Sequence, residues 1–487
     1  MAVISVSFMA FCIAVFFAYF VLPKVLRPYL LLVASLFFYA SFGFESFAFI
    51  GASIVSTFAC AHITSALKKK GRDRWAKFAL CITVIINMGI LTAVKYLNYS
   101  LSLFGMLLDK NAPSVSLIVP IGVAFYSMQA VSYCVDVFRG KYAPERNIFK
   151  YTLYMTFFPI ILQGPISRYD QLAHQLFLPH SFSYKRAKSG ILLVMFGLFK
   201  KIVIADRAAL LVNQVFGDYG DYQGIEIIIA ALMYTVQIYT DFSGCVDISR
   251  GISEVLGITL IDNFDHPYFS VSIKDFWRRW HKSLSAWFKD YIYIPLGGSR
   301  KGKIRKYVNL TVVFFVSGLW HGVGLHYVVW GLLQAFYQIF GELTEGVRHW
   351  IYDKCSVDRN SFSYRFGQRL ITFVLVNISW VVFRADGCVA AWKMLKSAVT
   401  VYNPWVLADG SILKLGLDGK DWNVMIFSLA VLLIVSLLQG KIHIRETLEK
   451  QTFWFRYSVY LLAIIGLLVF GIYGPGFDAA QFLYMQF

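Results

Sequence analysis

Two histidines in apolar, aromatic sequence are the residues of this chain best suited to chemistry. His281 follows the run Asp275-Phe276-Trp277-Arg278-Arg279-Trp280, and His321 follows the uncharged run Ser317-Gly318-Leu319-Trp320. A charged group at the centre of a membrane helix costs roughly 2.5 to 3.5 kcal/mol, so ionisable residues in such sequence tend to serve a function. Because imidazole takes and returns a proton near neutral pH, both histidines are candidates for a site of proton transfer.

Each of these assignments has a structural alternative. A histidine in a membrane segment can be a packing or hydrogen-bonding residue, and an interfacial histidine such as His281 can extend its ring toward water. Two acidic residues in apolar sequence, Asp241 and Asp247, likewise have both a functional and a structural interpretation. Either carboxylate can orient an imidazole, pair with Arg250, or cap a helix.

The sequence favours neither a metal site nor a bound cofactor. His326 follows His321 by five residues, which places the two side chains on different helix faces, and no acidic residue nearby completes a ligand set. The His-Glu-x-x-His motif, a Walker loop, a dinucleotide-binding glycine motif and a Gly-x-Ser-x-Gly elbow are absent. None of the nine histidines begins a His-x4-Asp motif. We therefore expect no metal ion and no resident cofactor.

The composition of the chain is that of a membrane protein. Of its 487 residues, 58% are hydrophobic and 15% are charged, against about 25% charged residues in soluble domains, and the mean hydropathy is +0.59. Because about 20 residues cross the hydrocarbon, the apolar stretches predict roughly ten to twelve spans, some of them re-entrant or interfacial. The stretches are residues 2–22, 29–42, 47–65, 78–94, 117–135, 190–204, 225–239, 307–320, 325–340, 370–383, 424–438 and 457–472. We predict an all-α polytopic membrane protein with one membrane domain, residues 1–487.

The net charge of +18 is concentrated in short connectors between these stretches, at residues 68–74, 139–150, 185–188 and 300–306. The positive-inside rule predicts that these loops face the cytoplasm, where they can also meet anionic lipid head groups. No nucleic-acid recognition module accompanies the charge, so we expect no nucleic-acid partner. The seven cysteines are scattered singly and are expected in the core.

Two segments are expected to position the histidines. Residues 273–291 place His281 on the apolar arc of an amphipathic pattern, which predicts a helix lying in the membrane interface. Residues 307–340 contain no Asp, Glu, Lys or Arg and are too long for one span. Two glycines in Gly322-Val323-Gly324 predict a break in the helix there. Non-helical backbone at membrane depth is tolerated only where it is buried in protein or lines a water-filled cavity, so the break could place His321 beside such a cavity.

The two histidine segments together resemble the membrane-bound O-acyltransferase family. The resemblance is carried by Asp275 to His281, by Asp290-Tyr291-Ile292-Tyr293-Ile294-Pro295-Leu296-Gly297-Gly298 and by Gly318-Leu319-Trp320-His321-Gly322. Further matches are Val119 to Tyr126, Gln163 to Tyr169, Tyr239 to Ser243 and the ending Gln481 to Phe487, where Met485 replaces a Phe. The chain is most similar to the alginate O-acetylation branch. The D-alanylation branch shares both histidines but tends to lack Pro295-Leu296-Gly297-Gly298.

The resemblance implies about eleven transmembrane helices, with re-entrant and interfacial helices around a central funnel or tunnel. It implies that His321 is the catalytic histidine and His281 the second motif histidine, and we expect His321 to act as general base. The residues expected along the donor and acceptor passage are Trp320, Asn309, Ser317, Arg278, Arg279, Lys282 and Asp241. The three cations are expected to meet either coenzyme A phosphates or lipid head groups.

The implied function is transfer of an acyl group, most simply acetyl from acetyl-CoA, for O-acetylation of an exported polysaccharide or peptidoglycan. The expected partners are the acyl donor, the lipid bilayer and a periplasmic or extracellular esterase-like protein, and the expected location is the cytoplasmic (inner) membrane. Teichoic acid D-alanylation and other acceptors are alternatives within the family. A transporter that uses His321 and Asp241 is the alternative from another class, although no inverted repeat is evident.

Overall fold

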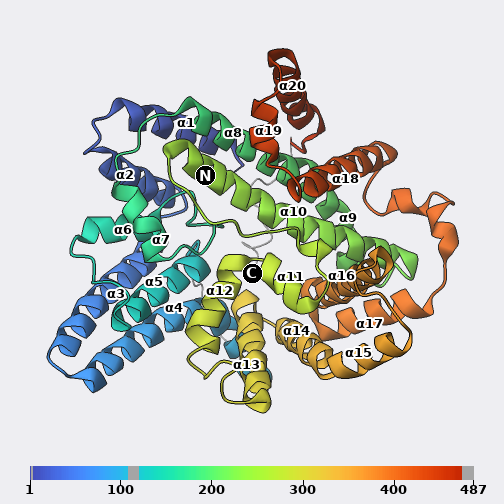
Figure 1. Cartoon of the computed structure of the whole chain (residues 1–487), viewed down its shortest axis with the longest axis horizontal. Helices are drawn as coiled ribbons and strands as arrows, with labels where there is room; N and C mark the ends of the chain where they lie inside the picture. Colours follow the sequence, from blue (N-terminus) through green and yellow to red (C-terminus); the bar gives the residue numbers. More distant parts are fainter. Residues whose placement is uncertain (2–3, 108–119, 474–487) are drawn as a thin grey trace. The chain divides into compact units, whose positions relative to one another are not determined.

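The computed structural model describes residue 1, residues 4–107 and residues 120–473 of the chain (Figure 1). Every regular element in these ranges is a helix, and no strand occurs in them, which confirms the predicted all-α class. The predicted ending from Gln481 to Phe487 and the residue Val119 lie outside the described ranges.

The described residues form two compact units. The first contains residues 1–194 and 246–261, and the second contains residues 195–245 and 262–473, so that α8 (Tyr184–Leu198) and α10 (Ile225–Leu256) contribute to both. The other helices of the first unit are α1 (Val6–Val21), α2 (Arg27–Ala40), α3 (Ser46–Lys69), α4 (Asp73–Leu107), α5 (Val123–Phe138), α6 (Ile148–Thr156) and α7 (Tyr169–Phe177). That the whole chain is one domain remains a prediction.

The second unit carries both histidine segments. It begins with η1 (Phe199–Ala205), a π-helical stretch, and α9 (Asp206–Gly217), and it contains the site helices α11 (Ile273–Arg279), α12 (Lys282–Phe288), α13 (Lys303–His321) and α14 (Leu325–Leu343). The remaining elements are η2 (Pro267–Phe269), η3 (Lys289–Tyr293), α15 (Glu345–Lys354), α16 (Phe362–Arg384), α17 (Gly387–Thr400), η4 (Pro404–Leu407), η5 (Ser411–Lys414), α18 (Gly419–Gln439), α19 (Ile444–Glu449) and α20 (Phe453–Phe470).

Six helices of the described ranges are long and apolar enough to cross a membrane: α3, α4, α10, α16, α18 and α20. Three shorter apolar helices, α1, α2 and α5, accompany them. The basic connector predicted at residues 68–74 lies where α3 ends and α4 begins, since α3 ends at Lys69 and α4 begins at Asp73. The chain is therefore a membrane protein of several spans, and the count of eleven remains a prediction.

Polar side chains mark where several helices begin. Ser5, Asn147, Ser361 and Asp418 each stand at an N-cap and accept a hydrogen bond from a backbone N–H in the first turn of α1, α6, α16 and α18. Such a bond satisfies one of the N–H groups that the first helical turn leaves without an intrahelical acceptor. The helix starts are thus encoded locally.

The hairpin of α13 and α14 confirms the predicted break. α13 ends at His321, Gly322 is extended, and Gly324 has φ +139°, a conformation that favours glycine. Glycines also let the two helices approach closely: a Cβ added at Gly318 would collide with the Tyr327 carbonyl, and one added at Gly331 with the Phe314 carbonyl. The hairpin therefore fixes the end of α13 by backbone packing.

The segment around His281 differs from the single amphipathic helix that its pattern predicts. The chain is helical from Ile273 to Arg279 and again from Lys282, but Trp280 is extended and His281 has φ 44° and ψ 56°, in the left-handed region. A period of 3.6 residues cannot reveal a single left-handed residue, because the apolar positions on either side keep their spacing. The predicted buried arc nevertheless holds, since His281 is buried and Arg278 is exposed.

Candidate active site

His321 is the last residue of α13 and lies among aromatic rings. It is 4% exposed. Its ring centroid is 5.0 Å from that of Trp330, with planes at 88°, and 5.2 Å from that of Phe383, with planes at 82°. The neighbouring Trp320 ring lies 4.8 Å away. This surround excludes water from the sides of the imidazole that the three rings cover.

A wall of tryptophans connects three helices that lie next to the two histidines. Trp330 of α14 stacks on Trp380 of α16, with centroids 5.9 Å apart and planes at 14°. Trp280, next to His281, packs on Trp380 at 5.2 Å, and Trp277 packs on Trp330 at 5.8 Å. Aromatic pairs at such distances stabilise a core beyond their buried area. The wall therefore holds α11, α14 and α16 together.

One buried glutamine connects the same three helices by hydrogen bonds. Gln334 of α14 accepts a bond from Trp277 Nε1 (3.1 Å) and donates one to Ser379 Oγ (2.8 Å). The Ser379 hydroxyl in turn donates to the Val376 carbonyl (2.7 Å). Gln334, Ser379, Trp330, Trp380 and Phe383 were not among the site residues expected from the sequence. Their only signal was the presence of polar and aromatic residues in long apolar helices.

His281 lies beside Trp320, which therefore neighbours both imidazoles. The His281 centroid is 6.5 Å from that of Trp320 and 4.6 Å from that of Phe242, whose plane is at 82° to it. Only 1% of His281 is exposed. Burial lowers the pKa of this imidazole to about 3, so the ring is neutral at neutral pH and able to accept a hydrogen bond.

Asn309 and Ser317 lie on α13 with His321. Asn309 is buried, and its Nδ2 donates to the Gly298 carbonyl (2.9 Å) and the Leu296 carbonyl (3.4 Å). Asn309 thus binds the Pro-Leu-Gly-Gly loop to α13. Ser317 is buried one turn before His321, so the two side chains lie on the same face of the helix.

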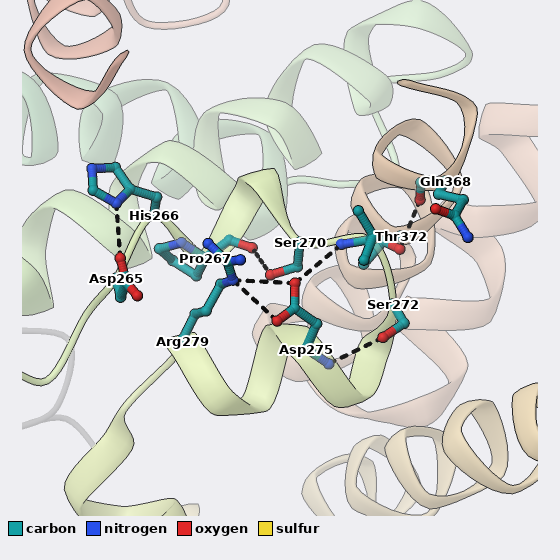
Figure 2. Close-up of polar contacts among 10 residues, drawn as sticks. Asp265, His266, Pro267, Ser270, Ser272, Asp275, Arg279, Gln368 and Thr372 are labelled. Atoms are coloured by element: carbon teal, nitrogen blue, oxygen red, sulfur yellow. Dashed lines mark hydrogen bonds and ion pairs between the residues drawn. The ribbon is translucent and has the colours of Figure 1, made fainter. Parts of the chain in front are cut away.

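The three predicted cations are in different environments. Arg278 is exposed. Arg279 Nε donates to both carboxylate oxygens of Asp275 at 3.1 Å, as Figure 2 shows at α11, whose first turn is capped by Ser272. Lys282 lies 3.9 Å from a carboxylate oxygen of Asp262. Arg278 is therefore the most open of the three to a ligand or lipid phosphate.

Asp241 of α10 lies in a buried charge cluster around Lys201, which belongs to the π-helical stretch η1. Its carboxylate is 2.6 Å from Lys201 Nζ, which is also 2.7 Å from Asp206. Lys200 Nζ donates to Ser243 Oγ at 3.0 Å. Arg250 was one of the partners expected from the sequence for either acid. The structure pairs Arg250 with Asp247 at 3.2 Å, and it pairs Asp241 with Lys201, which is far away in the sequence.

The site combines two imidazoles with a surround that limits water. Both buried imidazoles lie beside the Trp320 indole, and further aromatic rings cover His321. A neutral imidazole can take a proton from a hydroxyl that attacks a thioester. This arrangement fits base-assisted acyl transfer.

Comparison with known proteins agrees with this chemistry. The model of the membrane-bound O-acyltransferase family (MBOAT) matches residues 143–355. The chain is 33% identical over 391 residues to the probable alginate O-acetylase AlgI of Pseudomonas syringae pv. tomato, covering 79% of this chain and 72% of that protein. It is 31% identical to the AlgI protein of Pseudomonas aeruginosa (85% and 77% covered) and 30% identical to the peptidoglycan O-acetyltransferase of Helicobacter pylori (76% and 73% covered). The chain therefore belongs to the membrane-bound O-acyltransferase family and is an O-acyltransferase.

Proposed function

We propose that this enzyme takes an acetyl group from a cytosolic thioester, acetyl-CoA, and passes it across the cytoplasmic membrane for O-acetylation of an exported polysaccharide or peptidoglycan. The observation that carries the proposal is that Trp320 neighbours two buried imidazoles in a chain of this family. Support for acetyl comes from the relatives, which are described as alginate O-acetylases and a peptidoglycan O-acetyltransferase.

In this proposal His321 is the general base. Its imidazole takes the proton of the acceptor hydroxyl as the oxygen attacks the thioester carbonyl. The C–O bond forms, the C–S bond breaks, and the proton passes to the leaving thiolate. A positioned base contributes about 10²- to 10⁴-fold in rate. The rings of Trp330 and Phe383 limit the water that would hydrolyse the donor.

The other predicted residues have supporting roles. His281, which also neighbours Trp320, binds the donor or the acceptor, and Ser317, on the His321 face of α13, is placed to contact a reacting group. The exposed Arg278 meets the phosphates of coenzyme A. Asn309 and Arg279 act through the loop and helix that they bind, and Asp241 through its pair with Lys201.

Delivery to the final acceptor is assigned to a periplasmic or extracellular esterase-like partner. The described residues of this chain form membrane helices and their connectors. We therefore assign delivery to a separate protein, which would receive the acetyl group from this chain. D-alanyl transfer is the second candidate within the family. The Pro-Leu-Gly-Gly loop that Asn309 binds is the feature that favours acetyl.

The test is reconstitution of the purified chain in vesicles with labelled acetyl-CoA outside and an acceptor glycan and partner inside. His321→Ala should lower acetyl transfer at least about 10²-fold. The matched control is His326→Ala, which removes a histidine from the adjacent helix α14 and should leave the rate near that of the unmodified chain. Undiminished transfer by His321→Ala would overturn the general-base role. Net flux of a free solute without acetyl transfer would favour a transporter.

A further inference from the structure

His281 occupies the N-cap position of α12, yet its side chain does not cap that helix. With φ 44° and ψ 56°, it is one of three non-glycine residues with positive φ in the described part of the chain. Residues with side chains populate this region sparsely, and they persist there only where the surrounding structure holds them. A neighbouring segment must therefore hold the turn.

Asn263 supplies the cap from a neighbouring segment. Its backbone carbonyl accepts the N–H of Lys282 (3.0 Å), and its side-chain Oδ1 accepts the N–H of Ser283 (3.1 Å). These are the first two N–H groups of α12, which a helix leaves without intrahelical acceptors. Asn263 is fully buried at 0% exposed, so water does not compete for these bonds. Asn263, twenty positions before Ser283, thus accepts the hydrogen bond that an N-cap side chain ordinarily accepts.

The two residues after Asn263 contact the same turn. The Asp265 N–H donates to the Arg279 carbonyl (2.9 Å), just before the turn. The ring of Phe264 packs edge-on against Trp280, with centroids 5.1 Å apart, and against Phe242 at 5.1 Å. Phe242 is the ring that contacts His281 at 4.6 Å. The short segment of residues 263–265 therefore fixes both the backbone and the surroundings of His281.

We propose that Asn263 is a positioning residue for acyl transfer, because its two acceptor oxygens hold the left-handed turn that places the His281 imidazole between Phe242 and Trp320. The inference rests on the proposed function in that His281 serves the reaction. It assigns to Asn263 no contact with substrate.

The kinetic test compares two buried asparagines that do the same structural work at different helices. Asn403 Oδ1 accepts the Ile225 N–H at the start of α10 (2.8 Å), and its Nδ2 donates to the Gln223 carbonyl (3.1 Å). Asn263→Ala should lower kcat at least about tenfold with little change in KM, whereas Asn403→Ala should not. Asn263→Asp keeps the acceptor oxygen and should restore kcat.

A double-mutant cycle separates positioning from general loss of stability. In a His281→Ala background, Asn263→Ala should cause no further fall in kcat, because the residue through which it acts is gone. Equal fractional losses in both backgrounds would overturn the proposal.

A second measurement, the rate of chemical modification of His281, does not require the enzyme to be active. Diethylpyrocarbonate modifies neutral imidazoles, and mass spectrometry of the purified chain gives the rate at His281. Asn263→Ala should raise that rate severalfold, with Asn403→Ala and Asn263→Asp near the unmodified chain. An unchanged rate at His281 overturns the inference.

If Asn263→Ala does not fold, the Asn263→Asp variant tests the inference instead. Faster modification of His281 in that variant would contradict the role of the acceptor oxygen. An inactive wild-type chain would refute the proposed function alone.

Discussion

His321 lies at the end of a helix hairpin that glycines hold together, whereas His281 lies in a left-handed turn between two short helices. The hairpin needs close backbone contact at Gly318 and Gly331. The turn depends on hydrogen bonds to Asn263. One histidine is thus positioned mainly by packing and the other mainly by polar contacts. We therefore expect a side chain added at a glycine to affect the hairpin. Loss of a hydrogen-bond acceptor or of a charge should instead affect the turn.

The largest effect on stability is expected at the buried charge cluster of Asp241, whose neighbour Phe242 contacts His281. Lys201→Met removes the cation that Asp241 and Asp206 share, and uncompensated buried carboxylates destabilise a fold by about 3 to 5 kcal/mol. Thermal unfolding of the detergent-solubilised protein, followed by near-UV circular dichroism, measures the loss. Lys393→Met, at an exposed position on α17, is the control. Equal unfolding of the two variants would show that the cluster contributes nothing.

On the hairpin side, Gly331→Ala should lower the free energy of unfolding by about 2 to 3 kcal/mol, the upper part of the range for overpacking. The new Cβ would collide with the Phe314 carbonyl. Gly341→Ala, two to three turns along the same helix, meets no atom within 4 Å and should be neutral or stabilising. The same unfolding assay compares them. Equal stability of both variants would contradict packing as the support of His321.

A smaller effect is expected where both sides meet, at Gln334. Gln334→Leu leaves the Trp277 indole N–H without its acceptor, which should cost about 1 to 2 kcal/mol. Gln338→Leu, one turn along the same helix, serves as control in a denaturation series. A stability loss no greater than that of the control would show that this link between the two regions is dispensable.

The smallest effect is expected at the surface of α11. Arg279→Ala breaks a partly exposed pair with Asp275, and such pairs contribute about 0.2 to 1 kcal/mol. Arg278→Ala should leave unfolding unchanged and raise KM for acetyl-CoA instead. Steady-state kinetics together with unfolding midpoints compare the two. A KM effect confined to Arg279 would reverse the roles assigned to these arginines.

The sequence predicted the hairpin better than the turn. Uncharged length and two glycines were enough to predict the break after His321, and composition was enough to predict an all-helical membrane protein. The left-handed residue at His281 leaves no mark on apolar spacing, and its support from Asn263 is a tertiary contact. The same holds for Lys201 as partner of Asp241, because a buried pair between distant segments has no periodic signal.

The central claim is that the two differently supported histidines serve one reaction. The measurement is kcat for acetyl transfer by His281→Ala, His321→Ala and the double variant in the reconstituted system. We predict a loss of at least about 10²-fold for each single variant, and a double variant no more than about tenfold slower than the worse single one, since groups that act as a unit are non-additive. Multiplied losses in the double variant, or an undiminished rate in either single one, would contradict the claim.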